Sequence, residues 1–516
     1  MNYPVWDVAF GASLLIAVVA ILHVFVSHFA VGGGLFLVLT ERKALRAQDA
    51  VWLEWLKRHT RFFVLVTVVF GAVSGVGIWF TIGLIQPTAT SNLIHAFVWG
   101  WAIEWVFFFL EITAALLYLY GWDRLEPRRH LWFGWTYFLF ALLSMVVING
   151  MITFMLTPGR WVQERGFWEG FFNPTYFPSL FLRLSIAIAL AGVYALITAS
   201  RQPDAALKAR LVRWSTAWIV PPFILFPVFV RWYLRHVPSD LWASATGPMP
   251  TATRNARFAV FFSVATLVVA LLALIRPRRL HLAHSLVVVF LALGAMGSFE
   301  FVRESIRKPY VIANYLYSNS LYTSPMPGDG GYTPDGIDQA GVLATAKWLR
   351  THELTGTNRE AAGREIFRVE CQSCHTPNAY RGIKGFLAAR HWDEPKIQAM
   401  LGALDLMHNG VMPPFSGTGA ERAALAGFLE ALHPCEGTQA HIEDGKTVFQ
   451  NNCGVCHRIQ SAGAVFATLR SMAAPAATQA LKDLPGLFPP MPDLKLSEQE
   501  RTALIRWVDS QPIPKR

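Results

Sequence analysis

The sequence predicts an all-α protein: a polytopic membrane helix bundle of about eight spans, with its N-terminus outside, followed by two small all-α domains. Of the 516 residues, 53% are hydrophobic and only 15% are charged, whereas soluble domains carry about 25% charged residues. Eight apolar runs are long enough to cross a hydrocarbon layer of about 30 Å, and none follows residue 310. Two similar cysteine-containing segments occupy the polar remainder instead.

The predicted spans lie near residues 9–40, 62–86, 95–120, 131–156, 176–199, 213–234, 257–275 and 282–303. The first ten residues lack a basic stretch and a small-residue cleavage site, so we expect them to begin a retained helix and not a cleaved signal peptide.

Loop charges predict the orientation of the bundle. The loops 41–61, 121–130, 200–213 and 276–280 hold 6, 3, 4 and 3 Lys and Arg residues, whereas the opposite side (1–7, 87–94, 157–175 and 235–257) holds 0, 0, 2 and 3. The positive-inside rule places the first set in the cytoplasm and both chain ends outside. This clustering also explains the net charge of +11 without a nucleic-acid partner.

Composition divides the chain into four predicted regions. The membrane bundle covers 1–310, a Gly-, Pro- and Ser-rich connecting segment covers 311–358, and the two small domains cover 359–437 and 438–516.

Four of the five cysteines form two CxxCH motifs, Cys371-Gln-Ser-Cys374-His375 and Cys453-Gly-Val-Cys456-His457. Two thiols on one helical turn reach the two vinyl groups of one porphyrin, and the adjacent histidine then lies under the iron. The sequence therefore predicts two covalent haem c groups, attached outside the cytoplasmic membrane of a bacterium. A zinc site is the alternative for paired cysteines, but the histidine directly after each pair argues against it.

Similar helical segments, which begin at Gly363 and Gly445, precede the two motifs. Each motif is followed by a Met beside Pro and then by an amphipathic helix. This order resembles the class I cytochrome c fold, repeated in tandem. The resemblance implies Met412 and Met491 as the distal ligands of the two irons, with Met407 as a nearby competitor of Met412.

Ionisable residues within membrane spans are costly and mark functional sites. The third predicted span carries Ala102-Ile103-Glu104 and then Glu111, followed by Gly121-Trp-Asp-Arg-Leu125, and the first carries His23 before Gly32-Gly33-Gly34. These motifs resemble subunit I of the cytochrome bd quinol oxidases over about residues 1–320. Matches at Asn149-Gly150, Asn173-Pro174 and the segment from Glu304 to Tyr310 support it.

The resemblance implies that His23 is the axial ligand of a high-spin haem at an oxygen-reducing site. It implies that Glu104 lies beside that haem and that Glu111 belongs to a proton path. The resemblance further implies one or more non-covalent haem b (or d) groups in the membrane domain. It also implies a second membrane subunit of bd type or a homo-oligomer. Periplasmic electron-transfer proteins, oxygen or quinol, and membrane lipid complete the expected partners.

Several family features are changed in this chain. Where the family has a histidine and a methionine for its low-spin haem b, this chain offers Leu182 or Arg183 and Ala259. The quinol-binding loop is reduced to about 236–256, and the glutamate that ligates the second high-spin haem aligns with Gly297. Glu300 lies one turn along on a similar face and is our candidate replacement.

Because the quinol-oxidising parts are missing and two c haems are added, we expect electrons to enter through the c haems. The favoured function is a bd-like oxidoreductase with oxygen as acceptor. The first alternative is a subunit that relays electrons between quinol or a membrane haem b and periplasmic partners. The second is a bare membrane anchor, against which the intramembrane His23, Glu104 and Glu111 argue.

Overall fold

The computed structural model describes residues 3–239, 241–242, 250–323, 332–433, 444–457, 463–487 and 491–511. By packing, the chain divides into two units. One unit consists of residues 16–83 and 89–307, and the other of residues 1–15, 84–88 and 308–516. Each unit is described separately below.

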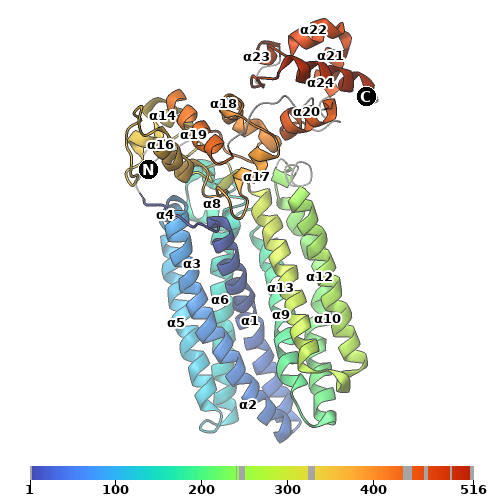
Figure 1. Cartoon of the computed structure of the whole chain (residues 1–516). Coiled ribbons are helices and arrows are strands. Elements are labelled where there is room, and N and C mark those ends of the chain that lie inside the picture. The colour runs from blue at the N-terminus through green and yellow to red at the C-terminus, as the bar shows by residue number, and fades with distance from the viewer. Residues whose placement is uncertain are drawn as a thin grey trace. The chain divides into compact units, whose positions relative to one another are not determined.

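The membrane unit is built from eight long apolar helical stretches within the described residues, as predicted (Figure 1). The second stretch runs continuously through α2, the π-helical η1 and α3, while the others are single helices. The eight stretches are α1 (Ala12–Arg46), α2–η1–α3 (Ala50–Val64, Leu65–Phe70, Gly71–Ile85), α5 (Val98–Gly121), α6 (Pro127–Phe154), α9 (Tyr176–Ser200), α10 (Ala205–His236), α12 (Pro250–Ile275) and α13 (Leu282–Ile306). Their length and hydropathy make this a membrane protein.

Helix α9 is the most enclosed of the spanning helices. It packs against α6, α10 and α13, and α5 pairs with α6 as its antiparallel neighbour. Short helices join the spans: α4 (Pro87–Ala96), α7 (Trp161–Glu164), α8 (Phe167–Phe171) and η2 (Pro277–Arg279).

The glycine run of α1 allows close contact with α9. A Cβ atom at Gly32 would lie only 1.8 Å from the carbonyl oxygen of Ala187, so any side chain there would push the two helices apart. Small residues at such crossings are typical of membrane helix packing, where van der Waals contact drives association.

The C-terminal part of the other unit contains two copies of one helical arrangement. In the first copy, α16 (Arg359–Glu370) packs on α19 (Gly419–Ala431), and in the second, α20 (Gly445–Asn452) packs on α24 (Glu498–Ser510). A Cβ at Gly363 would lie 2.3 Å from the Ala424 carbonyl oxygen, and one at Gly445 would lie 2.1 Å from that of Ala503. The closing helices α19 and α24 both begin with a capping box. The structure therefore repeats the same glycine-mediated helix crossing in both domains.

The remaining elements of this unit are short. The connecting segment contains a two-stranded antiparallel hairpin and two helices, and its Ile337 and Val342 are fully buried in the hydrophobic core of the unit. These short elements are β1 (Tyr310–Ile312), β2 (Leu316–Tyr317), α14 (Pro334–Ala340), α15 (Val342–Thr345), α17 (Ile383–Ala388), α18 (Glu394–Leu401), η3 (Leu404–Asn409), η4 (Cys453–Val455), α21 (Gly463–Ser471), α22 (Ala474–Ala480) and α23 (Leu484–Leu487).

Candidate functional site

The two CxxCH motifs each fold into one tight turn after a helix. In the first, the backbone N–H groups of Cys374 and His375 both donate to the carbonyl of Cys371, at 3.1 and 2.9 Å. In the second, Cys456 and His457 donate to Cys453 at 3.1 and 2.8 Å. All four thiols are free and partly buried. This donor set fits covalent haem attachment, because each turn presents two thiols and a following imidazole.

The predicted distal methionines both lie at the edge of the hydrophobic core. Met412 and Met491 are partly buried and pack against it, whereas Met407 is 4% exposed and lies within it. Full burial of Met407 is consistent with a packing role, which leaves Met412 as the more accessible thioether of the first domain. The fifth cysteine of the chain, Cys435, belongs to neither motif and lies outside the described residues.

In the membrane unit, His23 contacts the second spanning stretch. Its Nδ1 lies 3.1 Å from the Ser74 hydroxyl oxygen. That hydroxyl donates its own proton to the backbone carbonyl of Phe70 at 2.7 Å, so it accepts from His23. With this arrangement Nδ1 is the donor of a neutral imidazole, and Nε2 is the nitrogen that a metal would take.

His28 has a similar tautomer but different surroundings. Its Nδ1 donates to the Val24 carbonyl at 2.7 Å. Its Nε2 is buried and has no hydrogen-bond partner among the residues that the structure describes, and the side chain is within electrostatic reach of Arg183 and Glu300.

Glu104 and Glu111 belong to a ladder of polar groups between α5 and α6. On α5 the members are Glu104, Glu111 and Tyr118, and on α6 they are Ser144, Tyr137 and His130. Seven residues separate successive members on both helices, which is two turns, or about 10 Å. Because the helices run antiparallel, the six side chains face one another as three rungs, which we call the polar ladder.

Hydrogen bonds join the first two rungs. The Ser144 hydroxyl donates to Oε1 of Glu104 at 3.1 Å. The Tyr137 hydroxyl lies 3.1 Å from Oε1 of Glu111 and equally far from the carbonyl oxygen of Ala30 on α1.

The third rung is closed by a carboxylate from α1, Glu41. Its Oε2 accepts from the Tyr118 hydroxyl at 2.6 Å and its Oε1 lies 2.7 Å from Nδ1 of His130. The second imidazole nitrogen of His130 faces the Tyr118 carbonyl at 2.8 Å, which can only accept. His130 therefore donates from Nε2, and a further proton is shared between its Nδ1 and Glu41. Both side chains are about 2% exposed.

Glu104 and Glu111 were predicted from the sequence. Their ladder partners were not: Glu41, Tyr118, His130, Tyr137 and Ser144. The available signal was the seven-residue spacing on both helices, together with charged residues inside apolar runs.

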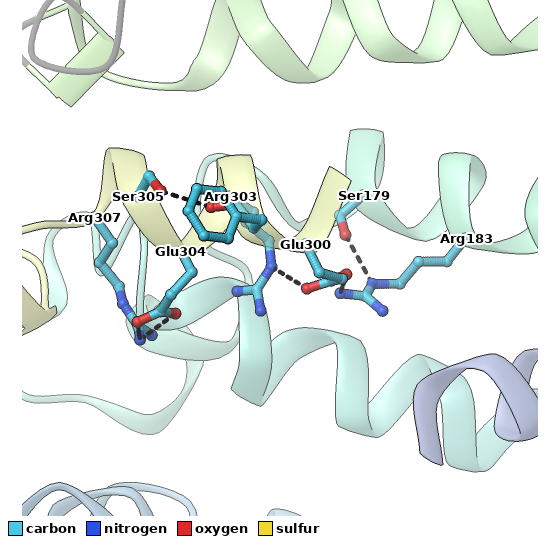
Figure 2. Close-up of polar contacts among 8 residues, drawn as sticks. Ser179, Arg183, Glu300, Arg303, Glu304, Ser305 and Arg307 are labelled. Atoms are coloured by element: carbon cyan, nitrogen blue, oxygen red, sulfur yellow. Dashed lines mark hydrogen bonds and ion pairs between the residues drawn. The ribbon is translucent and has the colours of Figure 1, made fainter. Parts of the chain in front are cut away.

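The third predicted acidic residue, Glu300, lies in a cluster of charges (Figure 2). One of its oxygens lies 2.7 Å from Nε of Arg303, one turn along α13, and the other lies 4.0 Å from Nη2 of Arg183 on α9. Arg183 also donates to the Ser179 hydroxyl oxygen at 3.2 Å. The three charged side chains are only 11–18% exposed, so each carboxylate oxygen of Glu300 is already engaged by a guanidinium group.

Two family models match the chain. Residues 12–226 match the model of cytochrome bd terminal oxidase subunit I. Residues 358–429 and 440–508 each match the model of cytochrome c oxidase, cbb3-type, subunit III. The membrane region is bd subunit I-like, and the C-terminal region consists of two cytochrome c domains. Both resemblances predicted from the sequence are thereby confirmed.

Comparison of folds agrees with this assignment. The structure of bd oxidase from Geobacillus thermodenitrificans is similar to the bd-like region, with a TM-score of 0.51 and 16% sequence identity over 63% of this chain and 91% of that chain. At this identity the likeness shows the shared fold. No curated protein matches the chain.

Taken together, the bd-like region and the cytochrome c domains make the protein a haem-containing respiratory electron-transfer oxidoreductase of the membrane.

Proposed function

We propose that this protein takes electrons from donors outside the membrane through its two c haems and delivers them to a non-covalent haem held by His23, where oxygen is reduced. The observation that carries the proposal is the pairing of Arg183 with Glu300 at the position that resembles the family's low-spin haem ligand. A guanidinium group cannot ligate iron, so quinol oxidation through that haem is unsupported in this chain. The c domains are the remaining source of electrons.

The residues of the membrane unit support a role for His23 and the polar ladder. A haem iron with an open coordination position binds oxygen and transfers electrons to it. His23 would hold the iron through Nε2, while the contact of Nδ1 with Ser74 orients the ring. Oxygen reduction consumes protons, and hydrogen-bonded carboxyl and phenol groups inside the membrane are the usual means of moving them.

Each rung has a defined task in this proposal. The third rung, with its shared proton between Glu41 and His130, would take a proton from the cytoplasm, since α6 begins at the predicted cytoplasmic loop 121–130. Glu111 and Glu104 would then carry it along α5 toward the haem. The haem type (b or d), the bacterial inner membrane, the periplasmic c domains, and a second bd-type subunit or homo-oligomer all belong to this proposal.

A second function rests on His28. Its Nε2, which has no hydrogen-bond partner within the described ranges, offers a second intramembrane ligand. This supports a relay between a membrane haem or quinol and periplasmic partners without oxygen reduction. The two functions differ in whether the membrane haem binds external ligands.

A spectrum of the purified protein tests the proposal. We expect a pyridine haemochrome assay to give two c haems plus non-covalent haem, and carbon monoxide to shift the dithionite-reduced spectrum. His23→Ala should abolish the carbon monoxide shift and leave both c haems.

His59→Ala is the matched control. His59 is a membrane histidine whose buried Nε2 has no partner in the described part of the chain. It is packed among the rings of Phe36, Trp55 and Phe62, so its loss should leave the haem spectrum unchanged. Non-covalent haem that does not bind carbon monoxide would favour the relay. An absence of non-covalent haem would refute both functions.

A further inference from the structure

The first haem-attachment motif is bound to a segment that leads directly into the membrane. Gln372, between the two cysteines of the motif, is 6% exposed. Its side-chain amide donates to Oδ1 of Asp7 at 2.9 Å and to the carbonyl oxygen of Trp6 at 3.3 Å. Five residues after Asp7, α1 begins at Ala12 and continues without interruption to Arg46, carrying His23.

Further contacts join the N-terminal segment to the same domain and to the end of the second span, and that end to the connecting segment. A Cβ at Gly11, where φ is +118°, would lie 3.3 Å from Cβ of Tyr380, so the N-terminal segment packs closely on the loop that follows the motif. The backbone N–H of Trp6 donates to the Leu84 carbonyl at 2.9 Å, and the Gln86 amide donates to the Ser318 carbonyl at 3.0 Å. The segments before the first span and after the second thus both belong to this contact.

The second cytochrome c domain is bound to the first. The indole N–H of Trp392 donates to the Asn451 carbonyl at 3.1 Å, two residues before the second motif. The ammonium group of Lys396 lies 3.8 Å from a carboxylate oxygen of Glu500 in the closing helix α24. Lys396 is buried to 7% exposure, so this ion pair is shielded from solvent and is more persistent than an exposed pair.

We infer that the domain of Cys371–His375 is the one that exchanges electrons with the membrane haem, and that the domain of Cys453–His457 receives electrons from the external donor. This inference rests on the proposed function, because it assumes a membrane haem. The rate of electron tunnelling falls steeply with distance. Because the second domain contacts the first, and the first contacts the segment that enters the membrane, electrons pass through the domains in that sequence. In each transfer one electron leaves a ferrous c haem, which becomes ferric, and reduces the next ferric haem; no bond or proton is exchanged.

The experiment uses electron backflow, which needs no external donor. The full-length protein is prepared with its membrane haem reduced and bound to carbon monoxide and its c haems oxidised. A light flash removes the carbon monoxide, and reduction of haem c is followed by absorbance. We expect Cys371→Ala/Cys374→Ala to abolish the fastest phase of backflow, and Cys453→Ala/Cys456→Ala to keep it at the rate of the unmodified chain.

Interface variants cover the case in which a domain without haem fails to fold. Asp7→Ala removes the nearer of the two acceptors of the Gln372 amide and should slow backflow at least threefold with both c haems present. Glu360→Gln, on an exposed position of α16, should not slow it. Fast backflow without the first haem, loss of backflow without the second, or an Asp7→Ala rate equal to that of the unmodified chain would each overturn the order. An absence of backflow in the unmodified chain would instead count against the proposed function.

Discussion

The Tyr137 hydroxyl lies 3.1 Å from Oε1 of Glu111 and 3.1 Å from the carbonyl oxygen of Ala30. A hydroxyl has one proton, so Tyr137 serves one of these acceptors at a time. When it bonds Ala30, a hydrogen bond to Glu111 requires a proton on the carboxyl group. The pair can therefore exist in two protonation arrangements with little movement of heavy atoms, as a proton relay needs.

Tyr137→Phe should block this exchange and leave the packing of the ring in place. If the ladder supplies protons, we expect oxygen uptake with ascorbate-reduced c haems to fall at least about tenfold, with an unchanged haem spectrum. Tyr194→Phe is the control, because Tyr194 is a buried tyrosine that stacks on Phe29 at 3.9 Å outside the ladder. Equal oxygen uptake in the two variants would remove Tyr137 from the proton route.

Glu41→Ala should destabilise the membrane unit strongly. It leaves the Tyr118 hydroxyl and Nδ1 of His130 buried without their acceptor, and losing one partner of a buried pair costs about 3–5 kcal/mol. Thermal unfolding in detergent measures this cost. Glu54→Ala is the comparison, because Glu54 and Arg58 form an exposed pair that contributes about 0.5 kcal/mol or less. Similar unfolding temperatures for both variants would mean that the third rung is solvated.

Glu300→Gln distinguishes two roles for this residue. If Glu300 is the counter-ion of Arg183 and Arg303, its neutralisation leaves two buried guanidinium groups without this carboxylate. We then expect the free energy of unfolding to fall by about 3–5 kcal/mol and the haem spectrum to be retained. If it ligates iron, as the sequence analysis expected, a haem band should disappear instead. Glu126→Gln is the control, because Glu126 and its partner Arg129 are both exposed, and it should change neither quantity.

Glu370 makes the first cytochrome c domain sensitive to pH. Burial raises the pKa of its carboxyl group to about 8, against a hydrogen bond from Asn319 that lowers it. The carboxyl is thus protonated at neutral pH and ionises as pH rises through about 8. The new negative charge beside Cys371 stabilises ferric iron, so the midpoint potential of this haem should fall over that window.

Redox titrations of the two c haems between pH 6 and 10 measure this effect, and Glu370→Gln should flatten the response of the first haem only. The same pKa affects stability. The folded carboxyl holds a proton that the unfolded one has lost above its ordinary pKa, so the free energy of unfolding falls as pH rises from about 4.5 to about 8. A potential that does not depend on pH in the unmodified chain would place Glu370 in contact with solvent.

Much of this architecture follows from local sequence. Hydropathy over about 20 residues predicts a spanning helix without reference to its neighbours, and all eight spans were found in this way. The CxxCH motif is equally local, because both thiols and the imidazole lie within one turn. The sequence also shows that Gly363 and Gly445 occupy equivalent positions before the two motifs. Their close contacts with Ala424 and Ala503 depend on how the helices pack.

The polar ladder could be predicted only in part. Glu104 and Glu111 were identified because carboxylates in an apolar run are unusual. Their partners are a serine and a tyrosine, which are common in membrane helices and give no signal alone. Glu41 was assigned to the predicted cytoplasmic loop 41–61, where a charged residue is ordinary. Nothing in its own segment indicates that His130, 89 positions away in sequence, lies 2.7 Å away in space.

Local sequence was enough to predict the number of spans, the two haem-attachment motifs and the family resemblance, because each depends on residues that are neighbours along the chain. Only the folded structure shows that His23 contacts Ser74, that Glu300 pairs with arginines, and which cytochrome c domain binds the N-terminal segment. These properties depend on hydrogen bonds and ion pairs between distant segments, such as Ser74 with His23 across 51 residues. A local pattern carries no information about which segments packing will bring together.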